Sequence, residues 1–274
     1  MTAREEFPDL PQWLTAGIHA ATPAGMRPFG ASQEDLTVDF RMARRPELMT
    51  QLLCLCCESS DGLPSDDALF LKMPIGLRIA LIVRLAQLTN PGPFSWHLHC
   101  TCNEENEFEL TAAQILSLSD GILDSESTSV VIGEDTSTVR RPTAHDQMRW
   151  LSQSDESQSK AMLRSILVSP SLEELLGKGH TLDSIAVALE GAMDSFDPLP
   201  CFQLSVGCPQ CGITQEVSPD LTGAALDRLQ RAQRAALEDV HRLASRYHWT
   251  EDQILGLPQW RRQSYLELIE GGTG

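Results

Sequence analysis

The chain has 274 residues and a formal net charge of −17, and hydrophobic residues make up 42% of it. This hydrophobic content is ample for a folded core, and the length allows one large domain or two small ones. Because the net charge is strongly negative and the basic residues are scattered, a surface for nucleic acid or for an anionic membrane is not expected.

Eight cysteines in a chain of this length are too few to indicate a disulfide framework, and the first residues lack the pattern of a secretory signal peptide. We therefore expect cytoplasmic synthesis with reduced thiols. The longest apolar run, Ile79–Val83, lies between two arginines and is much shorter than a membrane span. A soluble protein without membrane insertion is expected.

Residues 1–45 contain many prolines and glycines, with Trp13 and Phe29 as isolated apolar anchors. This composition predicts an extended N-terminal arm, either disordered or docked onto a partner or onto the rest of the chain. Residues 46–274 are expected to form a single domain.

A helical pattern begins at Pro46, where apolar side chains recur at steps of three and four residues. Cys54, Cys56 and Cys57 lie on this predicted helix and point in different directions, so buried structural cysteines are favoured over a metal site. A second helix is expected from about Ile75 to Leu88, before a run of prolines and glycine.

The middle of the chain predicts a β-hairpin followed by three helices. Residues 128–132 and 137–141 are rich in β-branched side chains and flank Gly133-Glu134-Asp135, which predicts two strands joined by a turn. Helices are then expected over three ranges: 143–151, 157–167 and 182–196.

The chain is expected to end in three helices, between about residues 221 and 270. The first, 221–247, has leucines on one side and charges on the other. The second follows a capping box at Thr250–Gln253, and the third starts at Pro258.

Trp249, Arg261 and Arg262 lie close to the junctions between these helices. Tryptophan and arginine are favoured anchors in protein interfaces, so these residues are predicted to bind a partner protein. The alternative for the first junction is that Trp249 packs between two helices as part of the fold.

The segment Cys208-Pro209-Gln210-Cys211-Gly212 places two thiols three residues apart in a tight turn. This spacing is typical of a zinc knuckle. Because tetrahedral zinc needs four ligands, a second pair of ligands is required elsewhere in the chain.

Aligning residues 93–102 with residues 202–211 supplies the second pair. The alignment matches His99 with Cys208 and Cys102 with Cys211, and each knuckle follows an apolar run and precedes a strand-like tail. The predicted structural zinc site consists of His99, Cys102, Cys208 and Cys211.

His97 and Cys100 lie beside the predicted ligand His99, and either can replace it. Two alternatives need no zinc: reduced cysteines at two hairpin turns, and a redox-active pair. The redox alternative is disfavoured because such a motif opens a helix, whereas Pro219 and a polar stretch follow here. The elements together predict a mixed α+β fold, mostly helical, around a small β core made of the two paired zinc-knuckle hairpins.

Motifs for enzyme chemistry are missing from the sequence, which has no serine elbow, phosphate-binding glycine loop or dinucleotide fingerprint. We therefore expect neither catalysis nor a small-molecule substrate. The catalytic alternative is a zinc hydrolase with a base among Glu104, Glu105 and Glu107. It is disfavoured because sulfur-rich zinc sites with knuckle spacing are usually structural and closed.

Five segments follow one another in a characteristic order: Met73–Arg78, His97–Cys102, Val139–Asp146, Cys208–Gly212 and His241–Leu266. The last of them is the most specific, with a Tyr-x-Trp turn and an Arg-Arg-x-x-Tyr-Leu helix. In this arrangement, from about residue 46 to 270, the chain resembles baseplate-associated zinc-knuckle proteins of contractile phage tails and phage-derived contractile injection systems.

The resemblance implies a non-enzymatic protein with a structural zinc that binds other baseplate or tail subunits. It implies either a baseplate component that stays in the particle or a hub-assembly chaperone that leaves it. Such proteins usually have Cys-x-x-Cys at both knuckles, whereas this chain has His99-Cys100-Thr101-Cys102 at the first. The alternative function is a zinc-ribbon adaptor for nucleic acid, which requires a basic face that this acidic sequence does not show.

Overall fold

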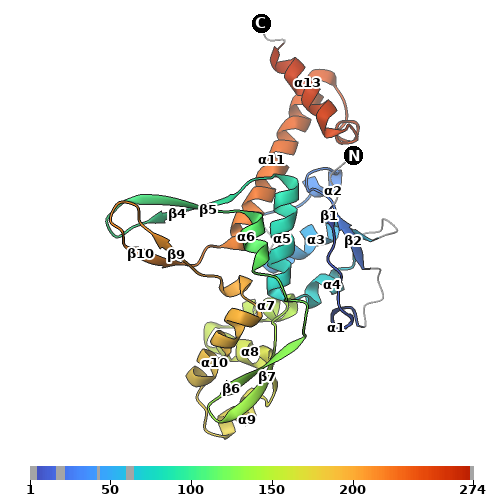
Figure 1. Cartoon of the computed structure of the whole chain (residues 1–274). Coiled ribbons are helices and arrows are strands. Elements are labelled where there is room, and N and C mark those ends of the chain that lie inside the picture. Colours follow the sequence, from blue (N-terminus) through green and yellow to red (C-terminus); the bar gives the residue numbers. More distant parts are fainter. Residues whose placement is uncertain (1–4, 17–21, 42–43, 60–64, 272–274) are drawn as a thin grey trace.

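The computed structural model describes residues 5–16, 22–41, 44–59 and 65–271, and at residues 155–157 it describes the backbone alone. The expected mixed α+β class is confirmed, with many helices and, within these ranges, four small separate sheets. Figure 1 shows a helical body from which three parts extend: a pair of hairpins to one side, a lobe below, and the C-terminal helices above.

The centre of the body is helix α5 (Ile75–Thr89), which matches the expected second helix. It is apolar on nearly all sides, as expected of a helix surrounded by other elements. Its neighbours are α3 (Arg45–Cys56), α6 (Ala112–Ser117), α11 (Leu221–Tyr247) and the short 3-10 helix η1 (Leu199–Cys201). The main hydrophobic core therefore surrounds a helix, and the knuckle hairpins lie beside it rather than at its centre.

The described part of residues 1–45 is docked onto this body, which was one of the two alternatives for the arm. Leu14, Met26 and Phe29 are buried in the main core. The segment forms two short strands and two short helices, and its second strand pairs with a strand that follows α3. These elements are β1 (Glu5–Glu6), α1 (Gln12–Thr15), β2 (Pro23–Met26), α2 (Gln33–Leu36) and β3 (Cys57–Ser59).

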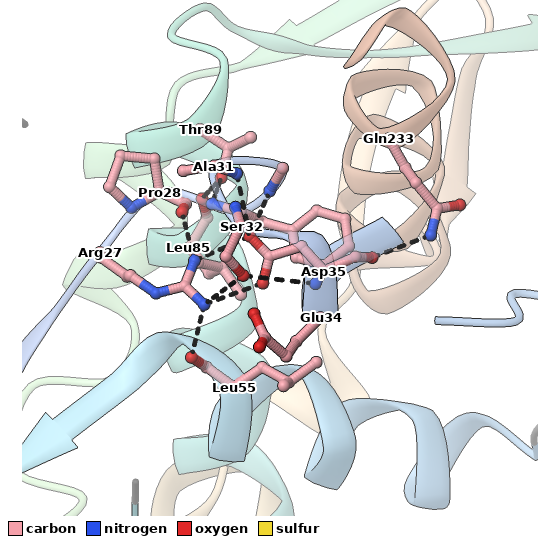
Figure 2. A network of polar contacts seen from close by, with 12 residues as sticks. Arg27, Pro28, Ala31, Ser32, Glu34, Asp35, Leu55, Leu85, Thr89 and Gln233 are labelled. Carbon is pink, nitrogen blue, oxygen red and sulfur yellow. Dashed lines mark hydrogen bonds and ion pairs between the residues drawn. The ribbon is translucent and has the colours of Figure 1, made fainter. Parts of the chain in front are cut away.

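A buried ion pair between Arg27 and Asp35 holds the later part of this segment against the body (Figure 2). The Arg27 guanidinium donates two hydrogen bonds to the Asp35 carboxylate, at 2.7 and 2.9 Å, and a third to the Leu55 carbonyl at 2.9 Å. The fully buried Asp35 carboxylate also accepts three consecutive backbone N–H groups, beginning at Gly30. Because the Gln233 amide of α11 donates to the Asp35 carbonyl at 3.0 Å, the segment is tied to α3 and α11 together.

The lower lobe has its own hydrophobic cluster, separate from the main core. Its sheet is antiparallel in the order β6-β7-β8, and the expected hairpin is confirmed as β6 (Ser127–Ile132) and β7 (Asp135–Arg140). The three expected helices are also confirmed, as α7 (Ala144–Leu151), α8 (Asp155–Ile166) and α10 (Leu182–Phe196). Several short elements of this region and of the body were not expected, among them α4 (Asp67–Lys72), β8 (Leu167–Ser169) and α9 (Leu172–Gly177).

The lobe is joined to the start of α5. The Ile75 N–H donates to the Pro142 carbonyl at 2.9 Å, and the Gly76 N–H contacts the buried Asp197 carboxylate at 3.4 Å. A side-chain carbon at position 76 would lie 1.8 Å from that carboxylate, so only glycine fits there.

The three C-terminal helices are confirmed, as α11, α12 (Glu251–Leu255) and α13 (Gln259–Gly271). The chain leaves α11 through His248, which has a left-handed φ of 58°. The short helices α12 and α13 then fold back against the end of α11, where Leu243, Ile254 and Leu266 form a third small core.

Candidate metal centre

Two antiparallel hairpins present the cysteine knuckles. The first pairs β4 (Phe94–His99) with β5 (Glu105–Leu110), and the second pairs β9 (Leu204–Gly207) with β10 (Thr214–Val217). In Figure 1 the hairpins lie side by side, and their turns meet at the end furthest from the helical body. Segments about a hundred residues apart in the sequence are thus brought together, as the shared-site prediction requires.

The two turns share one construction. In each, a residue directly after the second cysteine has a left-handed backbone: Asn103 with φ 67° and Gly212 with φ 74°. The N–H of that residue donates at 2.9 Å to the carbonyl of the first cysteine, Cys100 or Cys208. Glycine, and asparagine after it, adopt this conformation at the least cost, so the sequence permits both turns.

Four cysteine sulfurs converge where the turns meet. The Sγ atoms of Cys100, Cys102, Cys208 and Cys211 all lie within 4.8 Å of one another. The Cys100 and Cys211 sulfurs are 3.6 Å apart, and those of Cys102 and Cys208 are 3.8 Å apart. Zinc–sulfur bonds of about 2.3 Å in a tetrahedron give sulfur–sulfur distances of about 3.8 Å, so this cluster has the dimensions of a four-thiolate metal site.

The backbone of the turns favours thiolates at the first cysteine of each knuckle. The Cys211 N–H lowers the pKa of Cys208 to about 6, and the Cys102 N–H lowers the pKa of Cys100. At Cys102 the backbone N–H of Glu104 acts in the same direction, but neighbouring sulfurs and burial raise the pKa to about 12. A second thiolate beside the first is disfavoured by the repulsion between their negative charges. A bound cation would remove this repulsion, so the arrangement suits a metal ion.

Of the four predicted ligands, the structure brings together Cys102, Cys208 and Cys211, and it corrects the fourth. The fourth sulfur belongs to Cys100, which is buried, whereas His99 is an exposed residue of β4 opposite Glu105. His97 is also exposed, two residues earlier on the same face of the strand. The cluster therefore consists of four cysteines rather than three cysteines and a histidine.

The correction has a simple physical cause. The Cys100 N–H donates to Glu104, four residues later, whereas the Cys208 N–H donates to Ile213, five residues later. The first turn is thus one residue shorter than the second, and an alignment without a gap shifts the first ligand by one position. Asn103 and Gly212 each follow the second cysteine of a knuckle and have a left-handed backbone. Aligning these two residues would have placed the gap correctly.

The remaining cysteines lie elsewhere in the described structure. Cys54 and Cys56 lie in the last turn of α3, half-buried and fully buried, whereas the fully buried Cys57 begins β3 rather than lying on the helix as expected. Their burial is as expected for structural cysteines. Burial raises the pKa of Cys54 to about 11, which keeps this thiol protonated. Cys201 is exposed in η1 and is not part of the sulfur cluster.

The three residues predicted to bind a partner differ in exposure: Trp249 lies in the connection between α11 and α12, and Arg261 and Arg262 lie in α13. Trp249 is half-buried, stacks on Tyr247 with ring centres 4.8 Å apart, and meets Tyr265 edge-on at 4.9 Å. Arg261 is exposed, and its guanidinium donates to the Tyr265 hydroxyl at 3.3 Å.

Arg262 differs from its neighbour because it is half-buried. It lines a groove between α11 and the two short helices, together with Asp239. Burial raises the pKa of Asp239, and the charge of Arg262 opposes that rise. Trp249 and Arg262 therefore contribute to the internal packing of this region, and Arg261 faces solvent.

No family model, curated protein or solved structure matches this chain. Among the residues that the structure describes, none of the helices is both long enough and apolar enough to span a membrane.

Proposed function

We propose that this chain is a non-enzymatic structural or assembly protein of a contractile-tail or injection-system baseplate, with zinc bound by Cys100, Cys102, Cys208 and Cys211. In this role it binds other baseplate subunits through its surface, and the metal maintains the shape of the chain. It is made in the cytoplasm and is then either built into the particle or released after assembly.

The observation that carries the proposal is the four-sulfur cluster itself. Four cysteines at tetrahedral spacing complete the coordination of a zinc ion, and they leave no position for a reacting water. Zinc is the metal that four thiolates in this geometry most commonly hold, iron being the other. A closed site between two distant hairpins supports a structural role for the metal.

Two further segments of the family resemblance have structural roles in the fold. Met73–Arg78 and Val139–Asp146 meet where Ile75 donates to Pro142. Arg140 holds Asp146 with two hydrogen bonds, at 2.8 and 3.0 Å, and Asp146 caps helix α7. Arg140 and Asp146 are thus engaged in the fold, which favours a scaffold over a catalyst.

The nucleic-acid adaptor is disfavoured by the charges around the cluster. Neither hairpin contains a lysine or an arginine, whereas β5 alone carries three glutamates. Phosphate backbones are bound by basic side chains, so these hairpins would repel nucleic acid. The hydrolase alternative is disfavoured because the fourth ligand position is filled by sulfur.

The decisive experiment is to produce tail or injection-system particles with and without this chain. We expect particles to lack complete baseplates when the chain is absent, as seen by electron microscopy. Mass spectrometry of purified mature particles then distinguishes a resident subunit, which is present, from a chaperone, which is absent. Complete particles formed without the chain would overturn the proposal.

A further inference from the structure

Strand β6 forms an open edge of the lobe sheet. Among the described residues, the order β6-β7-β8 leaves β6 paired on one side only. Its six residues, Ser127–Ile132, include no charged residue, proline or glycine. Natural sheet edges are usually protected by charges, prolines, bulges or short length. The other described six-residue edge strands contain ionisable side chains: β4 carries two histidines and β5 three glutamates.

The hairpin turn determines which backbone groups face outward. Ile132 pairs with Asp135 across a two-residue turn in which Gly133 has a φ of 62°. In such a hairpin the residues next to the turn exchange hydrogen bonds, and every second residue does so after them. Ser127, Ser129 and Val131 are the intervening residues, so their N–H and C=O groups point away from β7. Outside the strand pairing, none of the three makes a hydrogen bond to another described residue.

The side chains beside this edge are small and uncharged. Ser127, Ser129 and Val131 are exposed, with 66% of Val131 accessible, and Thr136 and Thr138 of β7 lie on the same face. The opposite face is covered, because Val130 and Ile132 pack into the lobe core against α10. A further strand can therefore join the sheet from the open side without burying a charge.

Acidic residues at both ends of β6 indicate what kind of strand fits. Glu126 precedes the strand and Glu134 lies in its turn, and both are exposed and form no ion pair with another described residue. A second copy of the chain, paired antiparallel on this edge, would bring each Glu126 towards Glu134 of its mate. Like charges opposite one another destabilise strand pairing, so the charges favour a different polypeptide.

We propose that the edge of β6 binds an extended segment of another polypeptide as an additional antiparallel strand. The segment has an uncharged, β-branched centre and a basic residue at each end. Its backbone hydrogen-bonds to Ser127, Ser129 and Val131, and its terminal charges pair with Glu126 and Glu134. This surface is separate from the cysteine cluster, and the proposal does not depend on the metal or on the baseplate role.

The test uses the full chain and a fluorescent peptide, Lys-Thr-Val-Thr-Val-Thr-Lys. We expect this peptide to bind and to slow amide hydrogen exchange at Ser127, Ser129 and Val131. Two comparison peptides should not bind: one in which glutamate replaces both lysines, and one in which proline replaces both valines. Equal binding of the proline peptide would show general attraction of a basic peptide to an acidic protein and would overturn the proposal.

Variants of the edge make the test specific. Ser129→Pro removes one outward N–H, which proline tolerates at a sheet edge, and should weaken binding by about tenfold. Ser129→Ala keeps that N–H and should bind as the parent chain does. If the two variants bind the peptide equally, the strand-addition proposal fails.

A second variant leaves Ser129 unchanged, so its result does not depend on how strand β6 accommodates a proline. Glu126→Lys with Glu134→Lys should reverse the preference, so that the glutamate-flanked peptide binds and the lysine-flanked peptide does not. An unchanged preference would contradict the proposed end contacts. Dimerisation of the parent chain that Ser129→Pro abolishes, measured by sedimentation, would assign the edge to a second copy and overturn the proposal.

Discussion

Cys100 lies one residue beyond the last paired residue of β4, and this position decides which side chain faces the second knuckle. Along a strand, neighbouring side chains point to opposite faces, so His97 and His99 share the exposed face. Cys100 begins the turn instead, and its N–H closes the loop to Glu104 at 2.8 Å. The ligand set follows from where the strand ends.

Two single substitutions separate the alternatives for the fourth ligand. Cys100→Ala should lose bound zinc and lower the free energy of unfolding by several kcal/mol, because a closed metal site contributes directly to folding. His99→Ala should keep its zinc and its stability within about 0.5 kcal/mol, as expected for an exposed side chain. Zinc content and urea unfolding of both purified proteins give the answer. If His99→Ala loses its zinc and Cys100→Ala keeps it, the original prediction of a site made of His99 and three cysteines is correct.

Asp197 provides a pH-dependent test of the contact between lobe and body. Burial raises its pKa from 3.8 to about 6, although the Gly76 N–H and the charge of Arg141 act in the opposite direction. Well below its unfolded pKa of 3.8, the carboxyl is protonated whether the chain is folded or unfolded. Above pH 6 it is charged in both states, and the folded protein then bears a cost of up to about 3 kcal/mol.

We therefore expect the parent chain to lose stability relative to Asp197→Asn as the pH rises from 4 to 6. The measurement is urea unfolding of both proteins at pH 4 and pH 7. Taking the difference between the two proteins cancels the pH dependence of the cysteine cluster, which they share. A difference that is the same at both pH values would show that Asp197 does not titrate in this range.

At the level of elements, long amphipathic or apolar segments could be predicted from the sequence, whereas the short elements that were predicted, such as β6, β7 and α12, were those marked by a turn or a capping motif. Helices α10 and α11 begin and end where their caps and periodicity indicated, at Leu182–Phe196 and Leu221–Tyr247. Elements of two to six residues, such as β1, β8 and α9, have too few residues for a periodic pattern, and tertiary contacts determine them. Three cysteines of the cluster were identified from their spacing, and the fourth was misplaced by one residue because the first turn is one residue shorter than the second.

Substitution of Arg261 alone tests the predicted interface of the C-terminal helices more specifically than substitution of Arg261 and Arg262 together. Arg262 lines a groove beside Asp239, so a glutamate at position 262 would place a second negative charge near that carboxylate. Arg261 is exposed and should tolerate a change of charge. Arg261→Glu is expected to fold normally, to keep its zinc, and to reduce the yield of complete particles, because loss of an interface hot spot costs about 2 kcal/mol or more in binding.

A matched control for this variant is Arg234→Glu, which makes the same charge change on α11, where the side chain is 81% exposed. It should leave both folding and particle yield unchanged. If Arg261→Glu and Arg234→Glu give equal yields of complete particles, as counted by electron microscopy, the partner surface does not include Arg261. Unfolding of Arg261→Glu would instead show that this arginine stabilises the C-terminal helices.

In the whole molecule, the sulfur cluster joins two parts of the chain that flank the lobe. Cys102 and Cys208 are 106 positions apart, and the lobe lies within the segment that they enclose. A cross-link that closes a loop of about a hundred residues can stabilise a fold by up to about 5 kcal/mol. The metal is therefore expected to stabilise the arrangement of the whole chain as well as the hairpins.

Removal of zinc by a chelator should lower the melting temperature and raise hydrogen exchange in both hairpins, β4–β5 and β9–β10. The lobe and the main core, which have their own hydrophobic clusters, should keep most of their protection. Cys201→Ser is the control, since this thiol lies outside the cluster and its loss should not alter the response. Unchanged melting after complete zinc removal would show that the metal has no structural role.

The separation of the two knuckles also has a consequence for synthesis. Ribosomes add about 5 to 20 residues per second, so the second pair of cysteines is made on the order of 5 to 20 seconds after the first. During that interval the first hairpin has only two sulfurs, and the whole lobe emerges before the other two arrive. The four sulfurs can come together only after the lobe has been made, so the proposed zinc would enter late in folding and would bind a chain whose lobe has already had time to form.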